Sequence, residues 1–135
     1  MSREANLQIA GQFLGLMAQG AAPEEIANLF SEDLVFEIPG DDGVLPWIGR
    51  KTGRRAIGDF ITGLRTLTEP QKMEVHDVLA SESRAVILTT FATKVKATGK
   101  TIASAAAIVL EISDGKVQRF LMIEDSFEVS RKARS

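Results

Sequence analysis

The side chains of this chain that could move a proton are few, and most are carboxylates. The 135 residues include one histidine, His76, and neither cysteine nor tyrosine. Imidazole is the only side chain that titrates near neutrality without help from its surroundings. The polar candidates in or beside predicted strands are Glu37, Asp41, Asp42, His76, Asp77, Arg119, Glu124 and Asp125. Such groups favour general acid–base catalysis, which requires no cofactor.

Asp125 is the first candidate for a catalytic acid. Strand alternation places it on one face of the last predicted strand with Leu121, Ile123 and Phe127, while Glu124 falls on the opposite face. An acid among apolar side chains is costly to ionise, which suits a residue that transfers protons. The alternative is a structural role, in which Asp125 pairs with an arginine or caps the strand end.

His76 is the natural second member of an acid–base pair with Asp125. It lies within a predicted strand, where it alternates with Glu74 and Val78. A single histidine on a strand can also be structural or exposed, so this alternative stays open.

Composition and motifs exclude several other kinds of function. Sixteen Lys and Arg against eighteen Asp and Glu give a net charge of −2, so we expect no nucleic-acid partner. Because metal-ligand clusters, phosphate-loop spacing and dinucleotide fingerprints are missing, we expect neither a metal nor a cofactor. The basic segment 49–55 lies at a helix start, where it could attract an anion, but it lacks phosphate-loop spacing and is interpreted as a solvated turn. A polar amino terminus and the lack of a long apolar stretch predict no membrane segment and a cytoplasmic location.

Three helices are expected in the first half of the chain. Apolar residues recur every three or four positions from Arg3 to Ala18, and a short helix begins at Pro23. After Gly53, a third helix is indicated by four apolar residues at helical spacing, Ile57, Phe60, Ile61 and Leu64.

Strands and turns account for most of the remainder. A short strand is predicted over 34–38, and the loop 39–49 carries the only tryptophan, Trp47. Four extended segments follow, over 72–80, 84–96, 100–112 and 116–129. Asp114-Gly115 is the strongest turn signal between them, because a type I′ hairpin requires positive φ at both central residues. The predicted core includes Phe13, Phe36, Phe60, Ile61, Leu64, Val86, Leu88, Ile108, Leu110 and Leu121.

This order of elements predicts one α+β domain over residues 1–135. Three amino-terminal helices would pack on a curved, mainly antiparallel sheet. Both faces of its strands are partly apolar, and three short helices cannot cover so much sheet. We therefore expect a homodimer.

One strand face indicates where a cavity could open. Ala103, Ala105 and Ala107 share this face, so it either meets a closely packed helix or borders a cavity. A cavity lined with carbon favours an apolar or aromatic small molecule. Trp47 either covers the cavity or anchors its own loop. The residues predicted to bind the ligand are Phe36, Trp47, Phe60, Phe91, Ala105 and Ile123.

Two local patterns resemble the SnoaL-like and ketosteroid-isomerase-like branch of the NTF2-like superfamily. The first runs from Phe36-Glu-Ile-Pro39 through Leu45-Pro-Trp-Ile-Gly49 to Gly53-Arg-Arg-Ala-Ile57 and Phe60. The second runs from Asp114-Gly-Lys-Val117 to Ile123-Glu-Asp125. The resemblance implies a conical α+β barrel, in which a bent sheet wraps around a long helix and an apolar pocket opens at one end.

The resemblance also implies a catalytic arrangement from which this chain departs. Ketosteroid isomerases place a carboxylate base before a proline at the end of the first strand and use a tyrosine in the oxyanion hole. Here Ile38 precedes Pro39, and the chain has no tyrosine. Glu37 would be the shifted substitute for the base, whereas simple alternation makes it an ordinary outward-facing residue.

Two functions therefore remain open. The leading one is an apolar small-molecule site used for cofactor-independent acid–base chemistry, such as isomerisation, cyclisation, dehydration or hydrolysis. The other is a non-catalytic ligand-binding or dimerisation module of the same fold. Convergence of at least two of His76, Asp125 and Glu37 in one pocket would favour the enzyme.

Overall fold

The structure, a computed structural model, describes residues 2–134, which form four helices and six strands. The helices are α1 (Arg3–Gln19), α2 (Pro23–Ala27), α3 (Arg55–Leu67) and α4 (Ser126–Ala133). The strands are β1 (Phe30–Ile38), β2 (Gly49–Thr52), β3 (Thr68–Ala80), β4 (Arg84–Val95), β5 (Thr101–Ser113) and β6 (Lys116–Glu124). Within the described residues, no helix is long and apolar enough to cross a membrane.

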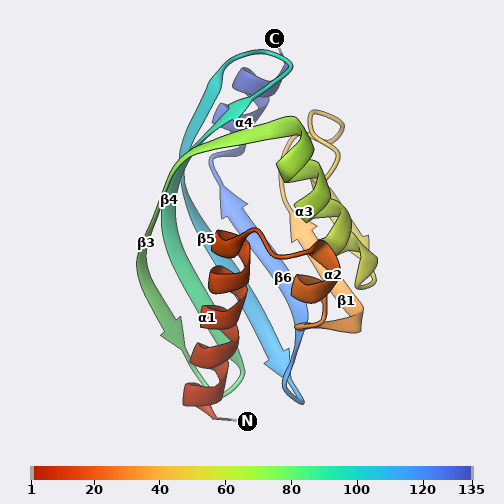
Figure 1. Cartoon of the computed structure of the whole chain (residues 1–135), viewed down its shortest axis with the longest axis vertical. Helices are drawn as coiled ribbons and strands as arrows, with labels where there is room; N and C mark the ends of the chain where they lie inside the picture. Colours follow the sequence, from red (N-terminus) through yellow and green to blue (C-terminus); the bar gives the residue numbers. More distant parts are fainter. Residues whose placement is uncertain (1, 135) are drawn as a thin grey trace.

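The six strands form one sheet in the order β2-β1-β6-β5-β4-β3. Neighbouring strands are antiparallel except β1 and β6, which run parallel. The sheet curves around α1 and α3, and α4 lies beyond the end of β6 (Figure 1). The prediction of an α+β fold with a curved, mainly antiparallel sheet is confirmed.

An aromatic cluster fills the concave side of the sheet. Phe36 and Phe120 are register partners on β1 and β6, and their rings stack with centroids 5.1 Å apart. Phe13 of α1 and Phe60 of α3 pack on Phe120 at 6.1 and 5.9 Å. Both helices are thereby fixed to the same point of the sheet.

The hairpin between β5 and β6 forms as predicted. Asp114 and Gly115 both have positive φ, 53° and 73°, as a type I′ turn requires. This turn sets the register of the two strands, in which Leu110 is paired with Phe120 and Ala106 with Glu124.

Gly63 allows the Trp47 loop to close onto α3. A Cβ at Gly63 would lie 3.0 Å from Cε3 of Trp47, which is tighter than nine in ten Cβ contacts in proteins. The indole ring also meets Phe60 edge-on, with centroids 5.8 Å apart. Trp47 therefore anchors its own loop, and this close contact accounts for a helical glycine that costs about 1 kcal/mol relative to alanine.

The predicted last strand, 116–129, is too long. β6 ends at Glu124, and α4 begins at Ser126 because Asp125 caps it: Asp125 Oδ1 accepts a hydrogen bond from the Glu128 N–H at 3.0 Å. The chain therefore has a fourth helix in addition to the three that were expected. The basic segment 49–55 also differs from the prediction, since its first half forms β2 and pairs with β1.

The predicted core face of β4 is the wrong one. Ala85 and Ile87 are fully buried, whereas Leu88 is exposed and Val86 only partly buried. Both faces of this strand are apolar, so alternation by itself does not distinguish them. The pairing of Ala85 with Leu110 on β5 places the buried face toward the aromatic cluster.

Candidate functional site

Glu124 is the acid that the fold places on the concave face of the sheet. It shares the β6 face of Phe120 and Met122, and Phe120 belongs to the aromatic cluster. Across the sheet, Glu124 is paired with Ala106 and Ala106 with Thr89, both buried. The small Ala106 side chain leaves room for a glutamate beside it.

Burial raises the pKa of Glu124 to about 7. Desolvation is the cause, because ionisation is disfavoured where water is excluded. A carboxyl group that titrates near neutrality is present both as acid and as base at pH 7. It can therefore donate and accept protons without a large energetic penalty in either direction.

The concave face beside Glu124 is apolar and only partly covered. The register places Ser104, Phe91 and Met73 in one row of this face, with Val75 in the adjacent row. Met73 is 55% exposed and Val75 is 44% exposed, while Phe91 packs half-buried against the core. These side chains offer an apolar surface on the same face as the titrating carboxyl group.

Three of the predicted ligand-binding residues are core residues instead of cavity walls. Phe36, Trp47 and Phe60 are buried, and their rings contact one another or Phe120. Phe91 is the predicted ligand residue that lies on the concave face near Glu124 and remains partly accessible.

Ala105 and Ile123 lie on the outer, convex face, so their prediction as cavity residues is wrong. Ala105 is exposed, as is Ala103, and Ile123 is 52% exposed. Ala105 lies between Ser104 and Ala106 of the concave face, and Ile123 lies between Met122 and Glu124 of that face. Strand alternation therefore points the side chains of Ala105 and Ile123 outward.

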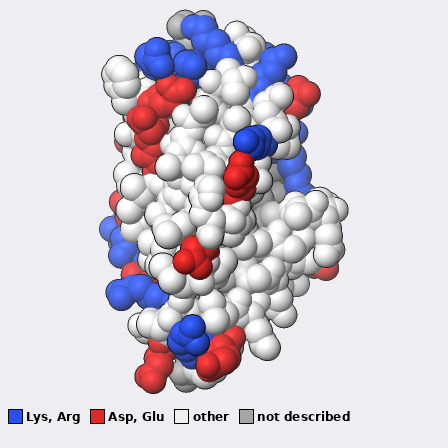
Figure 2. Space-filling model, turned by 90° about the vertical axis from the view of Figure 1, so that its left-hand side faces the viewer, with Lys and Arg blue, Asp and Glu red and all other residues white. Residues whose placement is uncertain are grey.

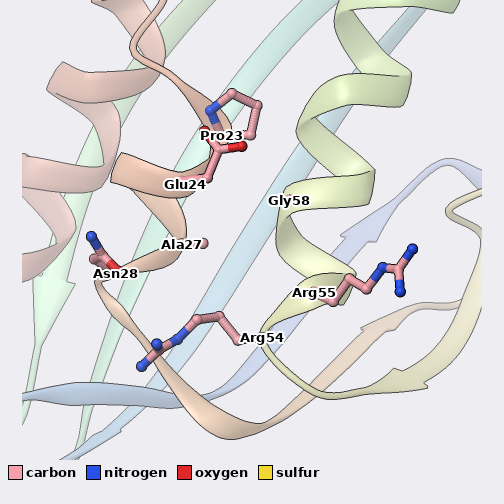
Figure 3. Close-up of a pocket in the computed structure, with 7 residues that line it drawn as sticks. All are labelled: Pro23, Glu24, Ala27, Asn28, Arg54, Arg55 and Gly58. Carbon is pink, nitrogen blue, oxygen red and sulfur yellow. The ribbon is translucent and has the colours of Figure 1, made fainter.

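Two shallow, open hollows of the described residues are lined by none of these side chains. One is lined by α2 and the start of α3, where the Arg54 and Arg55 side chains point in opposite directions (Figure 3). Arg54 Nε donates to the Phe30 carbonyl, and Arg55 pairs with Asp59. The other hollow lies along α1, next to Leu29, which follows α2. The residues that line it are Gly11, Gln12, Gly15, Leu16, Gln19 and Leu29.

Asp125 does not have the apolar surroundings that were predicted for it. Its side chain is exposed and caps α4, which corresponds to the structural alternative. Ile123 and Phe127 are also exposed, Phe127 to 74%. Asp125 was chosen because apolar neighbours would exclude water from it, and the structure does not give it those neighbours.

His76 and Glu37 lie near opposite edges of the sheet. His76 is exposed on β3, where Nε2 and Thr90 Oγ1 are 2.8 Å apart. Glu37 lies on β1 and pairs with Arg119 at 3.2 Å. Strands β6, β5 and β4 separate them, so Asp125, His76 and Glu37 do not converge, and their catalytic roles stay predictions.

Strand alternation contained the signal for Glu124, since it groups this acid with Phe120 and Met122. The choice between the two faces of β6 required the position of the aromatic cluster. Within residues 2–134, no three His, Asp or Glu side chains gather as they would around a metal ion.

Comparisons with known proteins place this geometry in a family. The model of the SnoaL-like domain matches residues 11–120. A search of curated proteins finds no match. An NTF2-like protein from Burkholderia xenovorans LB400 is 22% identical, with 99% of both chains covered and a TM-score of 0.88.

Two other similar structures contain small molecules. TerC, co-crystallised with polyporic acid, is 18% identical, with 97% of this chain and 99% of TerC covered and a TM-score of 0.80. A protein of ketosteroid isomerase-like fold from Catenulispora acidiphila DSM 44928, in complex with trimethylamine, is 15% identical, with coverages of 93% and 91% and a TM-score of 0.72. At these identities the likeness concerns the fold.

Proposed function

Because the chain belongs to the SnoaL-like domain family, we propose that it binds an apolar or aromatic small molecule on its concave face and that Glu124 transfers a proton to or from it. The observation that carries this proposal is the position of Glu124, a half-buried carboxyl group on the same sheet face as the half-buried Phe91 of β4 and the exposed Met73 and Val75 of β3. Small molecules bound to the similar TerC and ketosteroid isomerase-like structures support a small-molecule ligand, and the aromatic polyporic acid of TerC supports the aromatic class.

The chemistry is cofactor-independent acid–base catalysis. In an isomerisation, the Glu124 carboxylate would accept a proton from one substrate carbon and return it to another, so the residue ends in its starting state. The same group could support cyclisation, dehydration or hydrolysis as acid and base in successive steps. The pKa near 7 suits both half-steps.

Substitution of Glu124 tests this function directly. Glu124→Gln keeps the shape of the side chain and removes the titrating proton, so we expect turnover to fall at least about 100-fold while binding changes by less than about threefold. Turnover is measured on a panel of unsaturated ketones and apolar epoxides, and binding of polyporic acid is followed by the fluorescence of Trp47, the only tryptophan.

The matched control is Glu82→Gln, the same change at an exposed glutamate in the β3–β4 turn. Equal turnover of Glu124→Gln and the unaltered protein would refute the catalytic role. Binding without turnover of any panel compound in the unaltered protein would support the second function, a non-catalytic ligand-binding or dimerisation module.

We also propose that the outer face of the sheet joins two copies of the chain. Leu88, Ala107 and Ile123 form one row across β4, β5 and β6 on this face. Asp77 of β3 continues this row, and Leu79 of β3 is exposed in the adjacent row. Figure 2 shows a largely uncharged surface, with an acid beside a basic residue and one further acid near its middle and the other charges toward its ends and edges. Two such faces are self-complementary across a two-fold axis.

Light scattering tests the homodimer. We expect about twice the 14.6 kDa chain mass at tens of micromolar. Leu88→Lys should shift the protein to monomer, because it places a charge in the contact. Leu67→Lys is the matched control, since Leu67 on α3 is 38% exposed and Leu88 37%. A monomer in the unaltered protein would contradict the proposal.

A further inference from the structure

We propose that Asp41 is a positioning residue for Glu124: its carboxylate joins the loop 39–48 to α4, and the two together close the end of the concave face where Glu124 lies. This inference rests on the proposed function in one respect, namely that Glu124 is the group to be positioned.

The contact is a set of charge-assisted hydrogen bonds. Asp41 Oδ2 accepts from Ser130 Oγ at 2.6 Å and from Arg134 Nε at 2.8 Å, and Arg134 Nη2 lies 2.6 Å from the same oxygen. The hydrogen bonds from Ser130 and Arg134 lower the pKa of Asp41. The contact therefore persists throughout the pH range in which Glu124 titrates.

The loop 39–48 lies at the level of Glu124 along the sheet. In the parallel register of β1 and β6, Glu37 is paired with Leu121, so the loop that follows β1 begins at the same end of the sheet as the end of β6. A Cβ at Gly40 would lie 3.1 Å from Ile48 Cγ2 and 3.5 Å from the Cβ of Ser126, the first residue of α4. The loop and the helix thus meet next to the acid.

The helix is held independently to the sheet. Ser104 Oγ accepts the N–H of Asp125 at 2.9 Å, and Thr98 Oγ1 donates to the Lys132 carbonyl at 2.8 Å. Val129 is buried. Among the described residues, the side-chain hydrogen bonds that join the loop to α4 are those of Asp41.

Loss of the Asp41 contact should therefore release the start of the loop around Gly40 and Asp41, while the buried Trp47 holds its end and α4 stays in place. Water would then reach Glu124 from the side of the loop. Burial raises the pKa of this carboxyl group, so its titration reports how much of that burial the loop provides in addition to the strands.

The experiment follows the Glu124 carboxyl carbon by NMR in the full chain as pH is varied, with the resonance assigned by its loss in Glu124→Gln. In Asp41→Ala the midpoint should fall by at least about one pH unit toward the ordinary value of a glutamate. Asp42→Ala is the matched control, an exposed acid in the same loop. It should leave the midpoint unchanged.

A second variant removes the hydrogen-bond donors on Ser130 and Arg134 instead of the acceptor on Asp41. Ser130→Ala with Arg134→Ala removes both donors and leaves Asp41 in place, and it should reproduce the lower midpoint. An unchanged midpoint in folded Asp41→Ala and in the double variant would overturn the proposal, even if both lose stability.

The outcome is separable from that of the proposed function. Full turnover in Glu124→Gln would end the catalytic role of Glu124, whereas the titration shift concerns only the closure of the loop. The direct resonance is followed because other charged groups lie on the loop and on α4 and its two ends, namely Asp41, Asp42, Asp125, Glu128, Arg131, Lys132 and Arg134.

Discussion

Glu124→Gln is expected to be more stable than the unaltered protein at pH 8, by about 3 kcal/mol in the free energy of unfolding. Burial raises the pKa of Glu124 from 4.5 to about 7. A difference of about 2.5 between folded and unfolded pKa values corresponds to about 3 kcal/mol. Glutamine is neutral at every pH and keeps a similar shape, so it avoids the cost of a buried charge.

The direction in which folding stability changes with pH depends on whether the folded or the unfolded chain holds the Glu124 proton more tightly. Between pH 4.5 and 7, the folded protein keeps the Glu124 proton and the unfolded chain releases it. Unfolding therefore releases a proton, and rising pH favours unfolding. The stability that protonated Glu124 provides is complete below pH 4.5, declines as pH rises toward 7 and is lost above it.

Urea unfolding at pH 5, 6, 7 and 8 measures this effect. The gap between Glu124→Gln and the unaltered protein should widen from pH 5 to pH 7 and level off toward pH 8. Glu82→Gln, at an exposed position, should show no such gap. A constant difference across the four pH values would mean that Glu124 is ionised in the folded protein.

Phe120→Ala is expected to cost about 3 to 5 kcal/mol of folding stability. Phe120 is fully buried and joins the two helices to the sheet through its contacts with Phe13, Phe36 and Phe60. Removing the ring deletes apolar contacts in all these directions and leaves a cavity that the rigid β6 backbone cannot fill.

Phe127→Ala is the matched control, the same substitution at a ring that is 74% exposed. It should change stability by less than about 0.5 kcal/mol. Both variants are compared in urea at pH 7, where the unfolding midpoint gives the difference. Similar midpoints for Phe120→Ala and Phe127→Ala would contradict the assignment of the aromatic cluster as the core.

Several elements were predictable because their signals are local. The apolar spacing of Ile57, Phe60 and Ile61 indicates α3, and all three residues are buried. Asp114-Gly115 indicates the turn because few residue pairs tolerate positive φ. These patterns, with the resemblance to SnoaL-like proteins, were sufficient for the fold.

The site was only partly predictable, because the choice of the catalytic acid depends on which carboxyl group is buried. The sequence places Asp125 and Glu124 side by side, with opposite orientations on a strand. It also shows apolar side chains on both faces, so local pattern favoured neither. The sheet ends at Glu124, and the next residue becomes a helix cap instead of a buried acid.

By itself, the sequence determined the kinds of element, the turn at Asp114-Gly115 and a supply of carboxylates suited to acid–base chemistry. Only the tertiary structure decided which face of β6 meets the aromatic cluster and which acid loses its water. The physical reason is that alternation and helical spacing relate residues a few positions apart, whereas desolvation depends on all the atoms around a group. For Glu124, those atoms come from strands that are distant in the chain, such as Ala106 and Thr89.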